Sequence, residues 1–130
     1  MTGTGEAVGR YLAALNAHDP EAVGAAVTPT FVNEHTSVLG VTRVGRDAYV
    51  EAVRDFLARF HHLRYEPEDI LVDDDRAAVP YRLTFTTTGD DGQLHAVAIR
   101  GAFVFRVEDG LVAHRVDYWD SSDYQRQISG

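Results

Sequence analysis

Asp117 is the residue whose type and position most suggest chemistry. Asp is disfavoured in β-strands, yet Asp117 stands beside Tyr118 and Trp119 in a segment that predicts a strand. A carboxylate that faces an apolar interior is poorly solvated, so its pKa rises and it can act as a general base near neutral pH. On an outer sheet face, Asp117 would instead pair with Arg115 or Arg100 and have no chemical role.

The direction in which Asp117 points depends on the turn at Asp109-Gly110. In one arrangement, Glu108–Gly110 form a three-residue loop and Gly101 lies opposite Asp117, where it leaves room for a ligand. The residues that then face the interior are Arg115, Asp117 and Trp119. In the other arrangement the loop has two residues and the faces swap. The residues that then face the interior are His114, Val116 and Tyr118.

The elements that position these residues are helices in the first half of the chain and strands in the second. Helical spacing of apolar residues predicts helices over 8–17 and 49–60, and Asp19-Pro20 starts a short helix that ends near Val27. A first strand is expected over Phe31–Ser37, followed by a loop over Gly40–Gly45. The later strands are expected at Leu63–Val72, Ala77–Thr88, Leu94–Val107 and Leu111–Trp119.

This order predicts an α+β fold rather than alternating βαβ units. Alternating apolar residues from Val79 to Phe85 give the sheet one apolar face that needs a cover. We therefore expect a single domain over residues 1–130. In it, a cone-like curved antiparallel sheet packs on three N-terminal helices and encloses one apolar pocket.

Composition excludes several classes of function. With 20 acidic and 12 basic residues, the net charge of −8 argues against a nucleic-acid partner. No segment predicts a signal peptide or a membrane span, and there are no cysteines, so we expect a cytoplasmic protein without a membrane partner. No spacing of His, Asp or Glu is typical of a metal site, and no phosphate-binding loop is present, so neither a metal nor a cofactor is expected.

Several motifs resemble the nuclear transport factor 2-like superfamily, over about Glu6 to Gln127. The segment Arg10–Ala17 with Asp19 resembles the first helix of ketosteroid isomerases. The segments that resemble SnoaL-like polyketide cyclases are Phe103–Val112, Tyr118–Asp120 and Arg126-Gln127. Because this fold hosts isomerases, cyclases, dehydratases, epoxide hydrolases and proteins without chemistry, the resemblance identifies the fold better than the reaction.

The resemblance implies roles for three residues. SnoaL-like cyclases carry their catalytic Asp on the last strand, which favours the three-residue loop and makes Asp117 the acid or base. His35 aligns with the Asp base of the isomerases, and a neutral imidazole could carry out the same proton transfer. Tyr11 matches the isomerase tyrosine that donates to the developing oxyanion. A structural His35 beside a loop, or a Tyr11 buried in the core, would be equally ordinary.

The sequence also departs from these families. The second oxyanion donor of the isomerases would align with Gly101, so half of that oxyanion hole is missing. The Arg-x-Asp pair of limonene epoxide hydrolases would fall at Ile99 and Gly101. The histidine partner of the cyclases would fall at Phe103, and His35 could replace it from another strand.

We expect a cofactor-independent SnoaL-like enzyme that removes a proton next to a carbonyl of a hydrophobic small molecule, leading to cyclisation or isomerisation. Its catalytic residues would be Asp117, His35 and Tyr11. Its substrate-binding residues would be Asn33, Tyr81, Phe103, Phe105, Arg115, Trp119 and Phe56.

Two alternatives remain open. One is a dimeric domain that binds a small molecule without converting it. The other is an epoxide hydrolase or dehydratase of the same fold, which a water held between Asn33 and Asp117 would favour. In either case a homodimer is expected through the outer sheet face. The residues on that face are Arg82, Thr84, Val104, Val116 and Tyr118.

Overall fold

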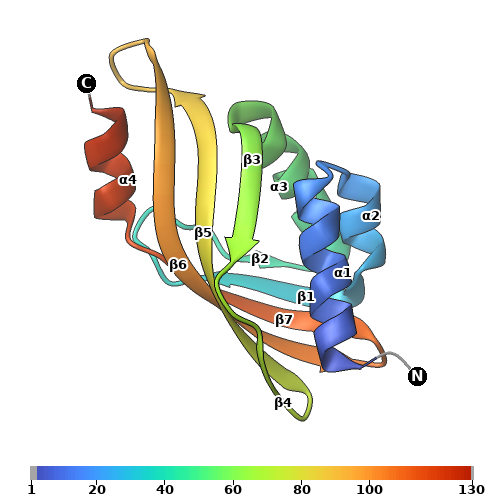
Figure 1. Cartoon of the computed structure of the whole chain (residues 1–130). Helices are drawn as coiled ribbons and strands as arrows, with labels where there is room; N and C mark the ends of the chain where they lie inside the picture. Colours follow the sequence, from blue (N-terminus) through green and yellow to red (C-terminus); the bar gives the residue numbers. More distant parts are fainter. Residues whose placement is uncertain (1–2, 130) are drawn as a thin grey trace.

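The computed structural model describes residues 3–129 as one strongly curved sheet with helices in its hollow and at its ends (Figure 1). The helices are α1 (Thr4–Asn16), α2 (Pro20–Ala25), α3 (Arg46–Arg59) and α4 (Ser121–Ile128). The strands are β1 (Val27–His35), β2 (Arg43–Val44), β3 (His61–Pro67), β4 (Leu71–Asp73), β5 (Arg76–Thr88), β6 (Leu94–Glu108) and β7 (Leu111–Tyr118). The expected α+β class is confirmed.

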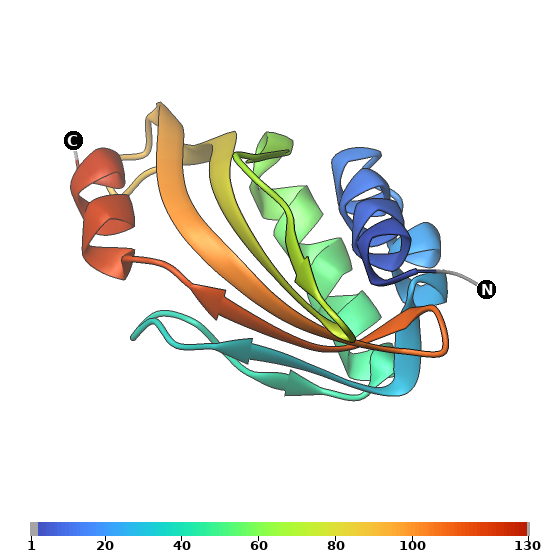
Figure 2. The same cartoon turned by 60° about the horizontal axis from the view of Figure 1, so that its bottom comes forward.

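Local sequence explains where the first helices begin and which face they bury. The α1 residues at helical spacing, from Val8 to Leu15, are buried against the sheet. Asp19 caps α2 by accepting a hydrogen bond from the backbone N–H of Ala22, and Pro20 occupies the first helical position. Figure 2 shows α3 lying across the hollow of the sheet, with α1 and α2 at one end and α4 at the other.

The sheet has the strand order β2-β1-β7-β6-β5-β3, and β4 pairs with β5. All pairs are antiparallel except β1 with β7, which run parallel. The parallel pair is possible because α3 and five strands lie between β1 and β7 in the chain, long enough for a crossover. Its register places His35 directly beside Asp117, although the two are 82 positions apart in the sequence.

The β6–β7 hairpin differs from the arrangement that the resemblance favoured. Asp109 and Gly110 both have positive φ, of 50° and 78°, and Glu108 pairs with Leu111, so the loop has two residues. The three-residue loop is therefore wrong. The pairing of Gly101 with Asp117 is also wrong, because Phe103 lies opposite Asp117.

Arg115 and Asp117 nevertheless face the interior, because β7 contains a bulge. Val107 pairs with Val112, whereas Arg106 pairs with His114, so Ala113 is an extra residue on β7. Val112 and Ala113 are both buried, and alternation resumes one residue out of phase. The bulge reverses the swap of faces that a two-residue loop alone would produce.

Three other boundaries differ from expectation. The segment Leu63–Val72 forms two strands, β3 and β4, rather than one. The first strand begins at Val27 instead of Phe31, and the Gly40–Gly45 loop contains the short strand β2. The helix α4 was not predicted; Asp120 caps it by accepting from the backbone N–H of Ser122. Among residues 3–129, no helix is long and apolar enough to cross a membrane.

Gln127 of α4 completes the edge of β6 beyond the end of β7. Its side-chain amide donates to the carbonyl of Ala98 at 2.8 Å and accepts from the N–H of Ala98 at 2.9 Å. These are the two bonds that a neighbouring strand would form with Ala98. The interaction holds α4 against the sheet and positions Tyr124 against Phe60 and Phe85.

We predict that Gln127→Ala lowers the free energy of unfolding by about 1–3 kcal/mol, because two backbone groups lose their partner. The matched control is Gln125→Ala on the same helix, since the Gln125 side chain is exposed; its effect should stay within about 0.5 kcal/mol. Urea denaturation of both variants measures the difference. Equal stabilities would show that α4 does not depend on this contact.

Candidate functional site

A cavity of about 680 Å³ lies between α3 and the concave face of the sheet. Its two ends differ in chemistry. The polar end is lined by Asn33, His35, Tyr49, Tyr81, Arg115 and Asp117. The apolar end is lined by Val53, Phe56, Phe60, Leu83, Phe85 and Ile99. Tyr81 and Phe85 lie four residues apart on β5, about 13 Å, so the cavity can hold a ligand with one polar end and an apolar body.

Asp117 lies at the polar end and is only 4% exposed. The hydroxyl of Tyr81 donates to its Oδ1 at 2.6 Å. Burial raises the pKa of Asp117 above the ordinary value for an aspartate, while the charge of Arg115 and the Tyr81 hydrogen bond oppose that rise. Since Oδ1 is held by Tyr81, Oδ2 is the carboxylate oxygen available for proton transfer.

Gly101 makes the contact between Tyr81 and Asp117 possible. A Cβ at position 101 would meet the Tyr81 hydroxyl and would lie 2.6 Å from its Cζ and 2.7 Å from the carbonyl oxygen of Tyr118. Any side chain here would therefore displace the Tyr81 ring. The room predicted beside Gly101 for a ligand is occupied by Tyr81 instead.

His35 lies next to the free oxygen of Asp117, with Nδ1 3.5 Å from Oδ2. Burial, followed by the charges of Arg115 and Arg43, lowers the pKa of His35 to about 4. His35 is therefore neutral at pH 7. A proton on the ring would add a third cation beside two arginines in a poorly solvated site.

The ring of the neutral His35 lies between two N–H donors, one at each nitrogen. Arg115 Nε donates to Asn33 Oδ1 at 2.7 Å, which orients the Asn33 amide so that its Nδ2 faces His35 Nε2 at 3.2 Å. Trp119 Nε1 faces the other ring nitrogen and donates to Nδ1 at 3.2 Å. A neutral imidazole has one lone pair, so His35 accepts from Trp119 at Nδ1 or from Asn33 at Nε2, and its proton lies on the other nitrogen.

Arg115 is a buried cation, only 4% exposed, surrounded by neutral groups. Besides Asn33, it donates to the hydroxyl of Tyr11 at 2.8 Å, and its guanidinium carbon lies 4.5 Å from the centre of the Phe103 ring. The Tyr11 hydroxyl is hydrogen-bonded in turn to that of Tyr49. Burial raises the pKa of both tyrosines, so their hydroxyls stay protonated. Asp117 is the buried carboxylate that balances the charge of Arg115.

Most residues that the sequence singled out do line the cavity. These are Asp117, His35, Asn33, Tyr81, Arg115, Trp119 and Phe56. Tyr11, Phe103 and Phe105 are buried but are missing from the cavity wall within residues 3–129. Tyr49 and Tyr65 stand in front of them. Tyr11 therefore reaches the cavity only through Tyr49, and the apolar wall predicted for Phe103 and Phe105 is formed by Leu83, Phe85 and Ile99 instead.

Sequence reasoning missed Tyr49, Tyr65 and Arg43 as site residues. Tyr49 begins the apolar stripe of α3 that continues at Val53, and Tyr65 shares its strand face with Leu63, so burial of both followed from spacing. Nothing in the sequence around Arg43 indicated that it would line the cavity, because its position depends on the pairing of β2 with β1. Among the described residues, no group of three or more His, Asp or Glu side chains could hold a metal ion.

Comparison with known proteins agrees with this architecture. The family model for the SnoaL-like domain matches residues 8–115. A protein proposed to be a SnoaL-like polyketide cyclase, from Shewanella denitrificans, is similar in structure, with a TM-score of 0.86 and 13% identity over 97% of this chain and 96% of that chain. No functionally curated protein matches the sequence.

Two further solved structures are similar. A protein proposed to be a polyketide cyclase, from Silicibacter sp., has a TM-score of 0.83 and 23% identity over 98% of this chain and 96% of that one. A Catenulispora acidiphila protein with a ketosteroid isomerase-like fold, in complex with trimethylamine, has a TM-score of 0.84 and 17% identity over 95% and 92%. At these identities the structures support the fold alone. Since the family model covers most of the sequence, the chain belongs to the SnoaL-like family.

Proposed function

We propose that this chain is an acid–base enzyme that removes a proton from carbon next to a carbonyl group of an apolar small molecule. The observation that carries the proposal is the state of Asp117: a buried carboxylate with one oxygen held by Tyr81 and the other 3.5 Å from a neutral His35. Desolvation makes this carboxylate a stronger base than an exposed aspartate.

In the proposed step, Oδ2 of Asp117 takes the proton as the C–H bond breaks, and the electron pair moves onto the carbonyl oxygen of the substrate. The hydroxyl of Tyr49, on the cavity wall, is available to donate to the developing oxyanion. Return of the proton to another carbon gives isomerisation. Attack of the enolate carbon on a second carbonyl gives cyclisation.

Arg115 favours this charge movement. Before the step its charge is balanced by Asp117; afterwards Asp117 is neutral and the negative charge resides on the substrate oxygen. The net charge of the buried group does not change, so no new charge has to be created in the poorly solvated interior. A fixed buried cation can stabilise the enolate without reorganisation.

The contacts of Asn33 do not decide between the proposal and the hydrolase or dehydratase alternative. Its Oδ1 accepts from Arg115 and one N–H of its Nδ2 faces His35, which leaves a second N–H that could hold a water beside Asp117. The alternative without catalysis shares the same cavity, so only a measurement of proton transfer separates it from the proposal.

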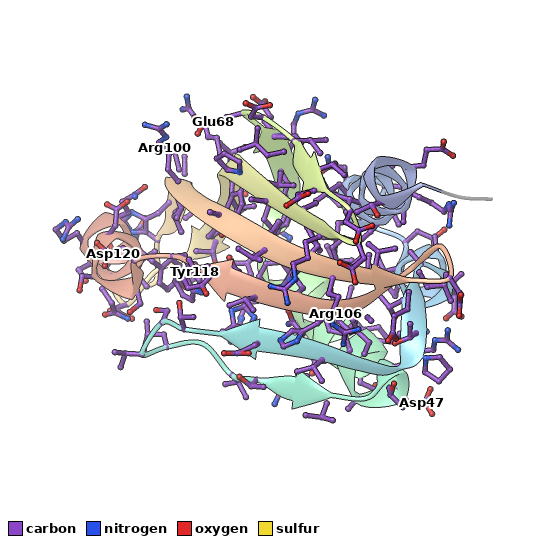
Figure 3. The ribbon with its side chains drawn as sticks, turned by 90° about the horizontal axis from the view of Figure 1, so that it is seen from below. Asp47, Glu68, Arg100, Arg106, Tyr118 and Asp120 are labelled. Carbon is purple, nitrogen blue, oxygen red and sulfur yellow. The ribbon has the colours of Figure 1, made fainter. Side chains whose placement is uncertain are left out.

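We also propose that two copies pair through the outer face of β6 and β7. Tyr118 is 49% exposed there, and Val104 and Val116 share this face of the sheet. Figure 3 shows Tyr118 on this face, with Glu68 and Arg100 side by side at its edge. Those two residues form an ion pair at 2.9 Å, typical of a polar rim around an apolar centre.

We predict that light scattering gives the mass of two 14.4 kDa chains. Val104→Asp should give one chain, because a charge at the centre of the face opposes its burial. Ala58→Asp, which adds a charge at an exposed position of α3 on the concave side of the sheet, serves as the matched control and should leave the mass unchanged. A wild-type mass of a single chain would contradict the pairing.

We predict that the wild-type chain opens the ring of 5-nitrobenzisoxazole, a neutral bicyclic probe whose C–H is removed by carboxylate bases to give a coloured cyanonitrophenolate. Asp117→Asn should lower the rate by about 100-fold or more. The rate should fall as pH decreases through the raised pKa of Asp117. Asp55→Asn is the matched control, because Asp55 lines the same cavity but is exposed. Equal rates for the wild type and Asp117→Asn would exclude Asp117 as the base.

We predict that the fluorescence of Trp119, the only tryptophan, reports the protonation of His35 with a midpoint of about pH 4. An imidazolium beside the indole should quench its emission. The step should be absent in His35→Gln and retained in His95→Gln, with circular dichroism confirming the fold at each pH. A midpoint near the ordinary 6.5 would show that the site does not exclude the imidazolium.

The same pKa shift predicts how stability depends on pH. The unfolded chain binds a proton at His35 more readily than the folded chain does. The contribution of the neutral His35 to stability is therefore complete above pH 6.5 and is lost as pH falls from 6.5 to about 4. Compared with the wild type, His35→Gln should show a smaller loss of stability over this interval in urea denaturation.

A further inference from the structure

A row of three side chains crosses three strands at the polar end of the cavity. The backbone register places Arg43 of β2 beside Asn33 of β1, and Asn33 beside Arg115 of β7. Side chains paired directly across strands point to the same face of a sheet. Asn33 and Arg115 face the cavity, and so does Arg43, which lines it. These three residues form the arginine row.

The arginine row contains two cations and no acid. Arg115 is buried and donates to Asn33 and Tyr11, both neutral. The ion pairs of arginines within residues 3–129 involve Arg54, Arg64, Arg100, Arg106 and Arg126, and none involves Arg43. Arg43 and Arg115 both lower the pKa of His35, so the charge of each extends into the polar end.

This local charge is opposite to that of the whole chain, whose net charge is −8. The positive charge of the arginine row also differs from the charge on the opposite wall of the cavity. On that wall, α3 carries Asp55 and Arg59 one helical turn apart, so their charges offset each other. At the polar end, Asp117 balances one guanidinium and leaves the other without a partner.

We propose that the arginine row binds a carboxylate of the ligand and that the substrate is an apolar oxo acid. The planar guanidinium of Arg43 suits a carboxylate, and the fixed charge of Arg115 behind Asn33 adds to the attraction. The ligand carboxylate replaces the missing acid in the row. The reactive carbon of such a substrate is identified only through the proposed function, but binding of its acid group requires no turnover.

The register also limits the length of the substrate. The His35–Asp117 pair lies two residues further along β1 and β7 than the Asn33–Arg115 pair, a step of about 7 Å. A carboxylate held at Arg43 therefore leaves only a few bonds before the carbon that faces Asp117. The rest of the molecule extends towards Phe85 at the apolar end. The geometry thus favours an acid whose carbonyl group is close to its carboxylate.

Two dyes that share one aromatic framework test the proposal. 8-Anilinonaphthalene-1-sulfonate carries an anionic group, and N-phenyl-1-naphthylamine is the same framework without it. In fluorescence titrations, Arg43→Gln should weaken the sulfonate about fivefold, as expected for a partly exposed ion pair, and leave the neutral dye unchanged. Sodium chloride should weaken only the sulfonate. Arg10→Gln, at an exposed position of α1 away from the cavity, is the matched control and should change neither dye.

Ala52→Phe establishes where the dyes bind, because Ala52 lines the cavity and a phenyl ring there would fill it. Both dyes should lose affinity in this variant. Three results would overturn the arginine row: no binding of the sulfonate to the wild type, sulfonate binding that survives Ala52→Phe, or an equal effect of Arg43→Gln on both dyes. If one of these results occurs and the wild type still reacts with 5-nitrobenzisoxazole, the proposed carboxylate site is wrong and the proposed role of Asp117 as a base stands.

If the dyes bind as expected but the wild type does not react with 5-nitrobenzisoxazole, the proposed function is wrong and the carboxylate site stands.

Discussion

The burial of two opposite charges on one strand is the constraint on which this site depends. Arg115 and Asp117 lie two residues apart on β7, and each is only 4% exposed. Removing either charge from water costs several kcal/mol, and attraction between the two offsets only part of that cost. The surrounding hydrogen bonds from Tyr81 and to Tyr11 and Asn33 supply the remaining compensation.

The bulge at Ala113 makes this arrangement possible. A strand that continued the register of the two-residue turn would direct Arg115 and Asp117 to the outer face, where both would be solvated and the pKa of Asp117 would not be raised by burial. With one extra residue, the same turn buries them. Helix α3 covers this side of the sheet, and both residues are buried there. The absence of a side chain at Gly101 gives Tyr81 the space to reach the carboxylate of Asp117. Thus one inserted residue and one missing side chain determine the chemistry of the cavity.

The sequence was sufficient for the fold class and for most of the residues that line the cavity. Local periodicity predicted the elements, and the family resemblance singled out Asp117 and His35. The stripe of α3, the alternation of β5 and the turn at Asp109-Gly110 all involve residues close in sequence. The bulge was not predictable, since nothing near Ala113 distinguishes a bulged from a regular strand. The inward direction of Asp117 was predicted correctly, but from a loop that the structure does not contain.

Contacts between distant segments were the other gap. The place of Arg43 in the cavity follows from the pairing of β2 with β1, and that of Tyr65 from the pairing of β3 with β5. The position of α4 depends on the contact of Gln127 with the free edge at Ala98. Tyr11 is another residue whose contacts could not be predicted from its position in the sequence. Its helical phase correctly indicates burial, but phase cannot show whether a second tyrosine, Tyr49, will stand between it and the cavity.

The environment of His35 and Asp117 brings their proton affinities closer together. In water a histidine binds its proton much more tightly than an aspartate does, with ordinary pKa values of 6.5 and 3.8. Here burial lowers the first to about 4 and raises the second, so the usual preference of a proton for the histidine is lost. A proton taken up by Asp117 is therefore not drawn to His35, although the two groups lie only 3.5 Å apart. A site that stabilised the ion pair of imidazolium and carboxylate would hold the proton on His35 and leave Asp117 a weak base. Excluding the imidazolium, through Arg43 and Arg115, therefore keeps the carboxylate reactive.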